Sequence, residues 1–131
     1  ELVGQVDLTA TLAALVGQDL PPEAAPDSEN LLPLLLGEEG AQGRETLITQ
    51  SSMGVLALRK GPWKFIQHLG SAGFSDPKRE KRRPGGPAVQ LYHLGDDPSE
   101  TTNLAAERPE VVEELSGLLE RLRSAERTAS R

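Results

Sequence analysis

The N-terminal part of the chain places short apolar segments between prolines and glycines. Asp7 precedes an apolar segment at residues 8–16, and Gly17 follows it. An acidic residue before apolar positions three to four apart, with a glycine after them, predicts a short helix with Asp7 as its N-cap. A second apolar segment at residues 31–36 ends at Gly37 and predicts one or two further helical turns. The prolines between the two segments indicate an extended connector.

Beyond residue 45 apolar and polar positions alternate, which is typical of strands. Four segments follow this pattern: residues 47–50, 54–59, 63–69 and 89–94. The second and third are separated by only three residues, so we expect them to form an antiparallel hairpin. Residues 70–88 are rich in glycine and proline and predict a long loop, which in a compact domain is either functional or disordered.

The clearest element is an amphipathic helix that starts at Pro109 and runs to about residue 124. Its apolar positions form one stripe: Val111, Val112, Leu115, Leu118, Leu119 and Leu122. A small antiparallel sheet of about four strands, packed against this long C-terminal helix, makes a two-layer α+β fold. The short N-terminal helix precedes the sheet at a distance in sequence, and we expect it to belong to a larger structure.

Composition narrows the class of protein. The chain has 131 residues, and its 14 Lys and Arg against 20 Asp and Glu give a net charge of −6. One compact domain fits this length, and the acidic balance argues against nucleic acid as a partner. The absence of cysteine excludes disulfides and thiolate metal sites. The longest apolar segment is far shorter than the roughly 20 residues that span a bilayer, so no membrane partner is expected.

Positive charge is concentrated in the long loop. Five cations and one carboxylate occupy residues 78–83, and the cations are Lys78, Arg79, Lys81, Arg82 and Arg83. The ordinary interpretation of such a run is a solvated loop. The functional interpretation is a substrate-binding segment, because Lys and Arg attract anions over a distance and form charge-assisted hydrogen bonds with their oxygens.

Other candidate chemistry is weakly supported. A hydrolase triad of Ser51 or Ser52 with His68 and Asp76 lacks the glycine-flanked turn that exposes a nucleophilic serine. The two histidines, His68 and His93, show no spacing typical of metal ligands, and we interpret them as strand-end and sheet-surface residues. We therefore predict no catalytic and no metal-binding residue in this chain.

Four segments, in order, resemble motifs of the sulfatase family. The pattern V-D-L-x-P-T-L-x-x-L-x-G is similar to residues 6–17, and L-P followed by D-G-x-S-L-x-P-L-L is similar to residues 20–35. The pattern A-x-R-x-G-x-W-K-L/Y-I is similar to residues 55–66, and L-Y-D-L-x-x-D-P-x-E-x-x-N-L-A is similar to residues 91–105. The chain departs from these patterns at Ala10, Ser28 and His93, which we expect at loop and surface positions. The resemblance identifies the chain as the C-terminal region of an arylsulfatase-like enzyme of the alkaline-phosphatase-like superfamily.

This resemblance implies a division of labour within a longer polypeptide. Sulfatases carry their formylglycine and Ca²⁺ in a large α/β domain, upstream of the segment that residues 6–17 resemble. Residues 1–36 would then be the tail of that domain and residues 37–131 the C-terminal subdomain. The upstream catalytic domain would be the partner and would hold Ca²⁺ and formylglycine, and a secreted or periplasmic parent is implied.

One segment of the loop imitates the formylglycine motif. Ser75, Pro77 and Arg79 match its skeleton, but Lys78 occupies the position of a small residue, so we interpret the match as coincidence.

Two functions follow from the sequence. In the first, the chain supports and gates the active site of a sulfuric ester hydrolase without being catalytic alone. In the second, it is a non-catalytic interaction module whose basic loop binds an anionic polymer. The apolar segments at residues 8–16 and 31–36 have no obvious partner within the chain, and we expect self-association of the isolated chain through them.

Overall fold

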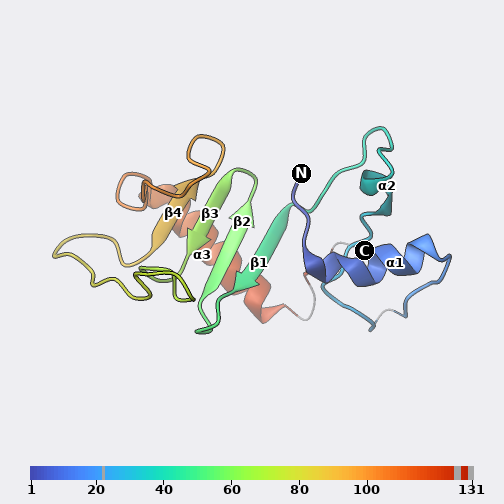
Figure 1. Ribbon diagram of the computed structural model, residues 1–131, viewed down its shortest axis with the longest axis horizontal. Helices are drawn as coiled ribbons and strands as arrows, with labels where there is room; N and C mark the ends of the chain where they lie inside the picture. The colour runs from blue at the N-terminus through green and yellow to red at the C-terminus, as the bar shows by residue number, and fades with distance from the viewer. Residues whose placement is uncertain (22, 126–127, 130–131) are drawn as a thin grey trace. The chain divides into compact units, whose positions relative to one another are not determined.

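The structure, a computed structural model, describes residues 1–21, 23–125, 128 and 129 (Figure 1). Its elements are a 3₁₀ turn η1 (Gln5–Asp7), helices α1 (Leu8–Leu15) and α2 (Leu32–Leu35), strands β1 (Thr46–Gln50), β2 (Leu56–Lys60), β3 (Trp63–Ile66) and β4 (Gln90–His93), and helix α3 (Pro109–Ser124). The chain divides into two compact units, Glu1–Leu47 with Leu122–Arg131, and Ile48–Arg121. Each unit is described by itself.

The larger unit consists of a sheet with α3 across one face (Figure 1). The strand order is β1-β2-β3-β4, and the pairs β2–β3 and β3–β4 are antiparallel. The pairing register places Leu58, Phe65 and Leu91 in one row across three strands. These three side chains, with Leu115 and Leu119 of α3, are at most 1% exposed and form the core. Burying an apolar side chain of this size stabilises a fold by about 1.5–3 kcal/mol.

The predicted α+β fold is confirmed, with a four-stranded antiparallel sheet, a C-terminal helix and a short N-terminal helix. The third strand is shorter than predicted, because it ends at Ile66 and not at residue 69. Past that point the carbonyl oxygens of His68 and Gly70 accept hydrogen bonds from the Gln90 side chain, at 2.7 and 2.9 Å. The backbone after β3 therefore leaves the sheet but stays attached to β4 through the Gln90 side chain.

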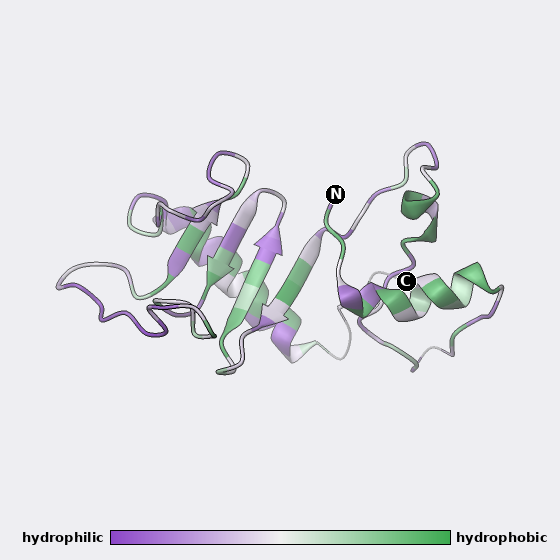
Figure 2. Ribbon diagram, in the orientation of Figure 1, coloured by the Kyte–Doolittle hydropathy of each residue, from purple (hydrophilic) through white to green (hydrophobic). Residues whose placement is uncertain are grey.

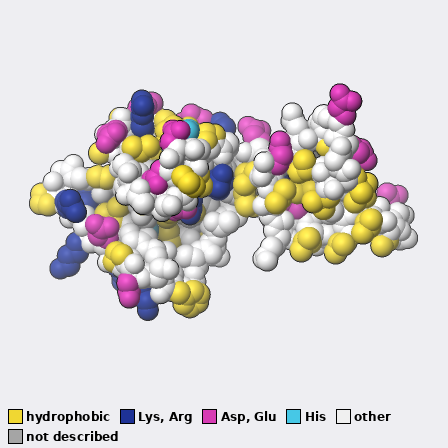
Figure 3. Space-filling model, turned by 45° about the horizontal axis from the view of Figure 1, so that its top comes forward, with side chains coloured by type: hydrophobic (Ala, Val, Ile, Leu, Met, Phe, Trp, Pro, Cys, Tyr) yellow, Lys and Arg dark blue, Asp and Glu magenta, His cyan; other side chains and the backbone are white. Residues whose placement is uncertain are grey.

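Helix α1 of the smaller unit is largely hydrophobic (Figure 2), and much of its apolar surface is exposed. The apolar side chains that are 53–68% exposed on or next to α1 and α2 are Leu8, Leu12, Leu15, Val16, Leu35 and Leu36. In the space-filling view, hydrophobic side chains gather over this unit (Figure 3). Contiguous exposed apolar surface of this kind is typical of a site that contacts another protein segment.

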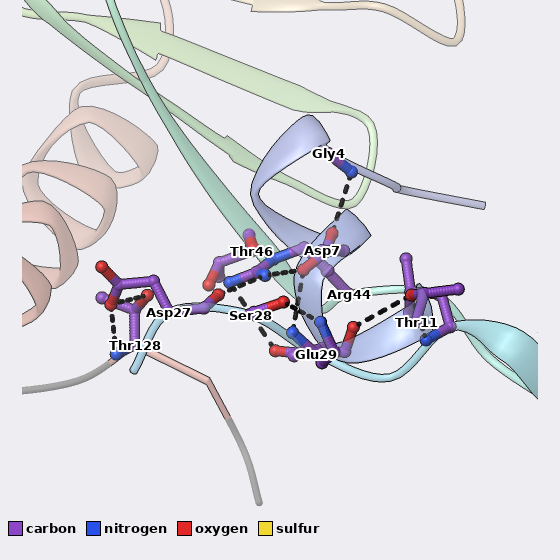
Figure 4. Close-up of polar contacts among 11 residues, drawn as sticks. Gly4, Asp7, Thr11, Asp27, Ser28, Glu29, Arg44, Thr46 and Thr128 are labelled. Carbon is purple, nitrogen blue, oxygen red and sulfur yellow. Dashed lines mark hydrogen bonds and ion pairs between the residues drawn. The ribbon is translucent and has the colours of Figure 1, made fainter. Parts of the chain in front are cut away.

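Asp7 directly precedes α1, as predicted, but its carboxylate does not cap the helix. One carboxylate oxygen accepts a hydrogen bond from the Gly4 N–H at 2.9 Å. The other accepts from the Glu29 N–H at 3.0 Å and from the Arg44 guanidinium, with which it forms an ion pair (Figure 4). The predicted N-cap interaction is therefore wrong, because this carboxylate is occupied by Gly4, which precedes the helix, and by Glu29 and Arg44, which are distant in sequence.

Asp7 and Arg44 are the centre of a buried polar cluster in the smaller unit, and Arg44 contacts further groups in it. Its guanidinium donates to the carbonyl oxygens of Thr46 and Asp27, both at 2.9 Å. The Asp27 carboxylate in turn accepts the Thr128 N–H at 2.9 Å and the Thr128 hydroxyl at 2.7 Å. Arg44 is only 7% exposed, so its charge depends on these partners and on Asp7.

The first turn of α1 is capped from outside the helix. The Ser28 hydroxyl accepts the Ala10 N–H at 2.9 Å, and the Thr11 hydroxyl accepts the Leu31 N–H at 3.1 Å. Ser28 thus supplies the oxygen that a capping side chain ordinarily provides. Ala10 and Ser28 are 8% and 1% exposed, so neither lies at the surface, although Ser28 lies in a loop as expected.

Candidate anion-binding site

The long loop between β3 and β4 folds back on itself. Three backbone hydrogen bonds join its two arms: Ser71 N–H to Pro77 O at 2.9 Å, Ala72 N–H to Lys78 O at 2.9 Å, and Glu80 N–H to Leu69 O at 3.2 Å. Gly70 lies buried at the base with a φ of +83°, and a Cβ at this position would come within 2.6 Å of the Pro77 carbonyl oxygen. Only glycine fits this close approach of two backbone segments. The basic residues are therefore presented on a loop of defined path.

Gln90 and Tyr92 attach the base of this loop to β4. The Gln90 side-chain NH₂ donates to two carbonyl oxygens of the loop base, those of His68 and Gly70. Its side-chain oxygen accepts the Tyr92 O–H at 2.7 Å. Gln90 and Tyr92 are 9% and 7% exposed, so this network forms a buried floor beneath the loop.

Burial raises the pKa of the Tyr92 phenol above its ordinary value. The carboxylates of Glu100, Glu80 and Asp97 add to the rise, because negative charge nearby disfavours the phenolate. The phenol therefore stays neutral at ordinary pH and keeps its proton for the hydrogen bond to Gln90.

The five cations of the loop are exposed and uncompensated. They are Lys78, Arg79, Lys81, Arg82 and Arg83, and within the described residues none of them forms an ion pair. Arg82 is held by one hydrogen bond, from its Nε to the Gly86 carbonyl oxygen at 2.6 Å. By contrast, Lys60 and Lys64 lie 2.7 and 2.6 Å from carboxylate oxygens. The loop therefore retains its excess positive charge.

Two of these five cations, Lys81 and Arg83, line a cavity of about 490 Å³. The remaining lining residues come from the base and the second half of the loop, from β4 and from the segment after it: Leu69, Glu80, Gly86, Pro87, Gln90, Tyr92, Thr101, Thr102, Asn103 and Ala106. The sequence indicated the basic wall but not the opposite one. The only available signal for that wall was the motif-like segment at residues 91–105.

The opposite wall is fixed by Asp97 and Asn103. The Asp97 carboxylate accepts the Thr101 hydroxyl at 2.9 Å and the Thr102 N–H at 2.8 Å. The backbone hydrogen bond from Thr102, followed by that from Thr101, lowers the pKa of Asp97 below its ordinary value. Glu100, at a φ of +55°, forms an ion pair with Lys64. Asp97 and Glu100 therefore act as acceptors for groups of the same chain.

Asn103 joins this segment to the outer edge of β4. Its side-chain oxygen accepts the N–H groups of Leu91 and Ala105, both at 3.0 Å, and its NH₂ group donates to the Val89 carbonyl at 3.1 Å. The Leu104 N–H then donates to the Leu91 carbonyl oxygen at 2.8 Å. Every hydrogen bond of the Asn103 side chain is made to a backbone group, so this side chain has a structural role.

The serine candidates take part in turns. Ser75 is exposed in the loop, and its carbonyl oxygen accepts the Ser71 hydroxyl at 2.5 Å. The Ser51 hydroxyl accepts the N–H groups of Met53 and Val55, at 3.3 and 3.2 Å, in the turn before β2. These contacts place both serines in local turn structure.

The two histidines lie apart, one on the sheet and one beyond the end of a strand. The His93 ring packs edge-on against Trp63, with ring centroids 4.7 Å apart, and its Nδ1 lies 2.7 Å from the Asp96 carboxylate. His68 lies beyond the end of β3, in the loop base. In the part of the chain that the structure describes, no three His, Asp or Glu side chains are grouped to hold a metal ion. The described residues also contain no helix long and apolar enough to cross a bilayer.

Comparison with known proteins assigns this fold and its motifs to one class of enzyme. No family model matches the chain. The chain is 43% identical to N-acetylgalactosamine-6-O-sulfatase of Bacteroides thetaiotaomicron over 124 residues, which are 94% of this chain and 24% of that protein. It is 34% identical to arylsulfatase A of Homo sapiens over 133 residues, which cover 90% of this chain and 26% of that protein.

A solved structure agrees. A Bacteroides thetaiotaomicron protein from a locus for the metabolism of multiple glycosaminoglycans has a TM-score of 0.72 and 43% identity, over 91% of this chain and 24% of that one. The shared region is a C-terminal part of a sulfatase. The chain belongs to the sulfatase family, and it spans about a quarter of the length of the curated relatives it matches. The predicted family is confirmed.

Proposed function

We propose that this chain acts as the C-terminal region of a sulfuric ester hydrolase, where it supports the active site and controls the approach of substrate. The observation that carries the proposal is the 43% identity to a sulfatase over 94% of the chain. On this proposal, formylglycine and Ca²⁺ belong to an upstream α/β domain of the same polypeptide. Residues 1–36 would complete that domain, and residues 37–131 would form the C-terminal subdomain.

The apolar face of α1 supports a contact with the rest of such a polypeptide. Leu8, Leu12 and Leu15 of α1 and the adjacent Val16 are 53–68% exposed, and burying each of them would stabilise a contact by about 1.5–3 kcal/mol. In the isolated chain the same face would favour self-association. The upstream domain and a second copy are thus alternative partners for one surface.

Substrate approach is assigned to the basic loop. Five exposed, unpaired cations raise the local concentration of anions, and a sulfate group presents oxygens that Lys and Arg bind through charge-assisted hydrogen bonds. The names of the relatives, N-acetylgalactosamine-6-O-sulfatase and arylsulfatase A, suggest sulfated sugars or aryl sulfates as the substrate class.

The test is charge reversal of the loop in the full polypeptide that carries this chain. Arg79→Glu, Lys81→Glu and Arg82→Glu together should lower kcat/KM for a sulfated sugar by about tenfold or more at low salt. The loss should appear mainly in KM and should shrink as salt screens the charges. The matched control, Arg108→Glu, reverses an exposed cation outside the loop and should change kcat/KM little. An unchanged kcat/KM in the triple variant would refute substrate steering, and hydrolysis of a phosphate ester without hydrolysis of a sulfate ester would refute the assigned reaction.

The second candidate is an interaction module that binds an anionic polymer through the same loop. The uncompensated charge of the loop favours it independently of any enzyme. Retention on heparin that is abolished by the triple variant, together with no turnover of any sulfate ester by the full polypeptide, would select this function.

A further inference from the structure

The cavity beneath the second half of the basic loop has the size and the polar lining of a small-molecule site. Its volume of about 490 Å³ falls within the range of roughly 300–1,000 Å³ typical of ligand pockets. Its walls come from three segments that hydrogen bonds hold in place: the loop, β4 and residues 101–103. The cavity is therefore preorganised.

The residues that line the cavity carry one net positive charge. Lys81 and Arg83 oppose one lining carboxylate, that of Glu80. The nearby carboxylate of Glu100 is bound by the Lys64 ammonium, at 2.6 and 2.8 Å. Asp97, the other nearby acid, keeps its negative charge but is not among the residues that line the cavity. An anionic group is thus favoured at the side of the cavity formed by Lys81 and Arg83.

The remaining polar atoms suit a ligand with hydroxyl groups. Gln90 and Asn103 use their amides on the backbone and on Tyr92, so they shape the walls without binding. Tyr92 donates its proton to Gln90, which leaves a lone pair on its oxygen as an acceptor. The Thr102 hydroxyl makes no hydrogen bond within the described residues, while its N–H is held by Asp97. The Glu80 carboxylate adds an acceptor for hydroxyl donors.

We propose that this cavity binds one anionic sugar unit. The sulfate or carboxylate of the sugar lies against Lys81 and Arg83, and its ring hydroxyls lie against Glu80, Thr102 and the Tyr92 oxygen. The choice of a sugar rests on the proposed function, whereas the positions of the anion and hydroxyl groups rest on the cavity alone. The cavity thereby adds selectivity to the general attraction that the five cations exert.

The experiment compares two pairs of substitutions in the full chain, each removing two positive charges from the same loop. Lys81→Gln with Arg83→Gln changes the cavity, and Lys78→Gln with Arg79→Gln changes only the loop outside it. Binding of glucose 6-sulfate, glucuronate and glucose is followed by calorimetry and by NMR shifts of residues 80–103. We expect the cavity pair to weaken binding of the anionic sugar by about tenfold or more, and the outer pair by less than about threefold. Whichever of glucose 6-sulfate and glucuronate binds more tightly identifies the anionic group.

Further outcomes separate this proposal from the proposed function. Equal losses from both pairs, or shifts confined to residues outside the cavity, would overturn the sugar site while leaving general steering by the loop intact. Binding of glucose as tightly as of the anionic sugars would also overturn it. Selective binding in the cavity, with no sulfate ester hydrolysed by the full polypeptide, would support the sugar site and reject the sulfatase function. Thr102→Val, which removes the hydroxyl but no charge, should weaken binding of each anionic sugar by several-fold. NMR spectra of all variants establish that the fold is retained.

Discussion

Replacing Asp7 with alanine removes the anion at the centre of the buried cluster of the smaller unit. The side chain is 2% exposed and accepts three hydrogen bonds, from the N–H groups of Gly4 and Glu29 and from the Arg44 guanidinium. Without it, two backbone donors lose their partner and Arg44 keeps a charge in a buried site. The nearest remaining carboxylate, that of Glu29, is 3.7 Å away. Leaving one member of a buried ion pair unpaired costs about 3–5 kcal/mol, a large share of the 5–15 kcal/mol that stabilises a typical domain.

The measurement is urea unfolding combined with hydrogen exchange. We expect Asp7→Ala to lower the free energy of unfolding of this unit by about 3–5 kcal/mol and to speed exchange of the amides at residues 28–31. A double variant with Arg44→Met should recover about 1–3 kcal/mol relative to the sum of the two single variants, because no charge is then left unpaired. Gln5→Ala, at an exposed position of η1, should change stability by less than about 0.5 kcal/mol. A loss below about 1 kcal/mol for Asp7→Ala, or no coupling with Arg44, would refute the account of the cluster.

Three further predictions concern the larger unit. Tyr92 is the single tyrosine, so the ultraviolet absorbance of its phenolate should show one titration, with a midpoint above the value of about 10 for an unfolded tyrosine and returning to it in urea. Because folding raises the pKa of the phenol, the neutral Tyr92 side chain contributes stability to the fold. This contribution is complete below about pH 10 and is lost as the pH rises through the pKa of the folded protein. A titration midpoint at or below about 10 would contradict this prediction. Asn103→Ala should lower the free energy of unfolding by about 1–3 kcal/mol and Asn103→Asp by less, since the aspartate keeps the acceptor oxygens; equal losses in thermal melts would count against this role. Gly70→Ala should cost about 2–4 kcal/mol, because of its positive φ and the collision with Pro77, whereas Gly85→Ala, also at positive φ but in open space, should cost about 1–2 kcal/mol in the same melts.

The parts of the fold that were predictable from the sequence are those set by periodicity. The stripe that includes Leu115 and Leu119 predicts α3 as observed, and alternation predicts the hairpin that pairs Leu58 with Phe65. The ends of the strands were less predictable. Strand β3 stops at Ile66, and beyond it the carbonyl oxygens of His68 and Gly70 bind the side chain of Gln90, which is 20 or more residues away. A side chain that binds the backbone in place of a neighbouring strand leaves no periodic pattern in the sequence.

The candidate site was predictable only on one side. The basic residues are contiguous and visible as a charge run, and Lys81 and Arg83 among them line the cavity. The opposite wall depends on Thr102, whose position is set by the Asp97 carboxylate through a turn. Likewise, the cap that Ser28 provides to α1 joins residues 18 positions apart. Such contacts depend on the tertiary fold, and neither composition nor spacing encodes them.

The Asn103 side chain has a consequence for how this sheet meets other molecules. A terminal strand with free N–H and C=O groups is a template on which a foreign strand can add, and such addition leads to aggregation. On β4 the outward-facing N–H and C=O of Leu91 are already bound, by the Asn103 side chain and the Leu104 N–H. An incoming strand would first have to displace both contacts. The protein therefore blocks strand addition at this edge with a single amide and a returning segment.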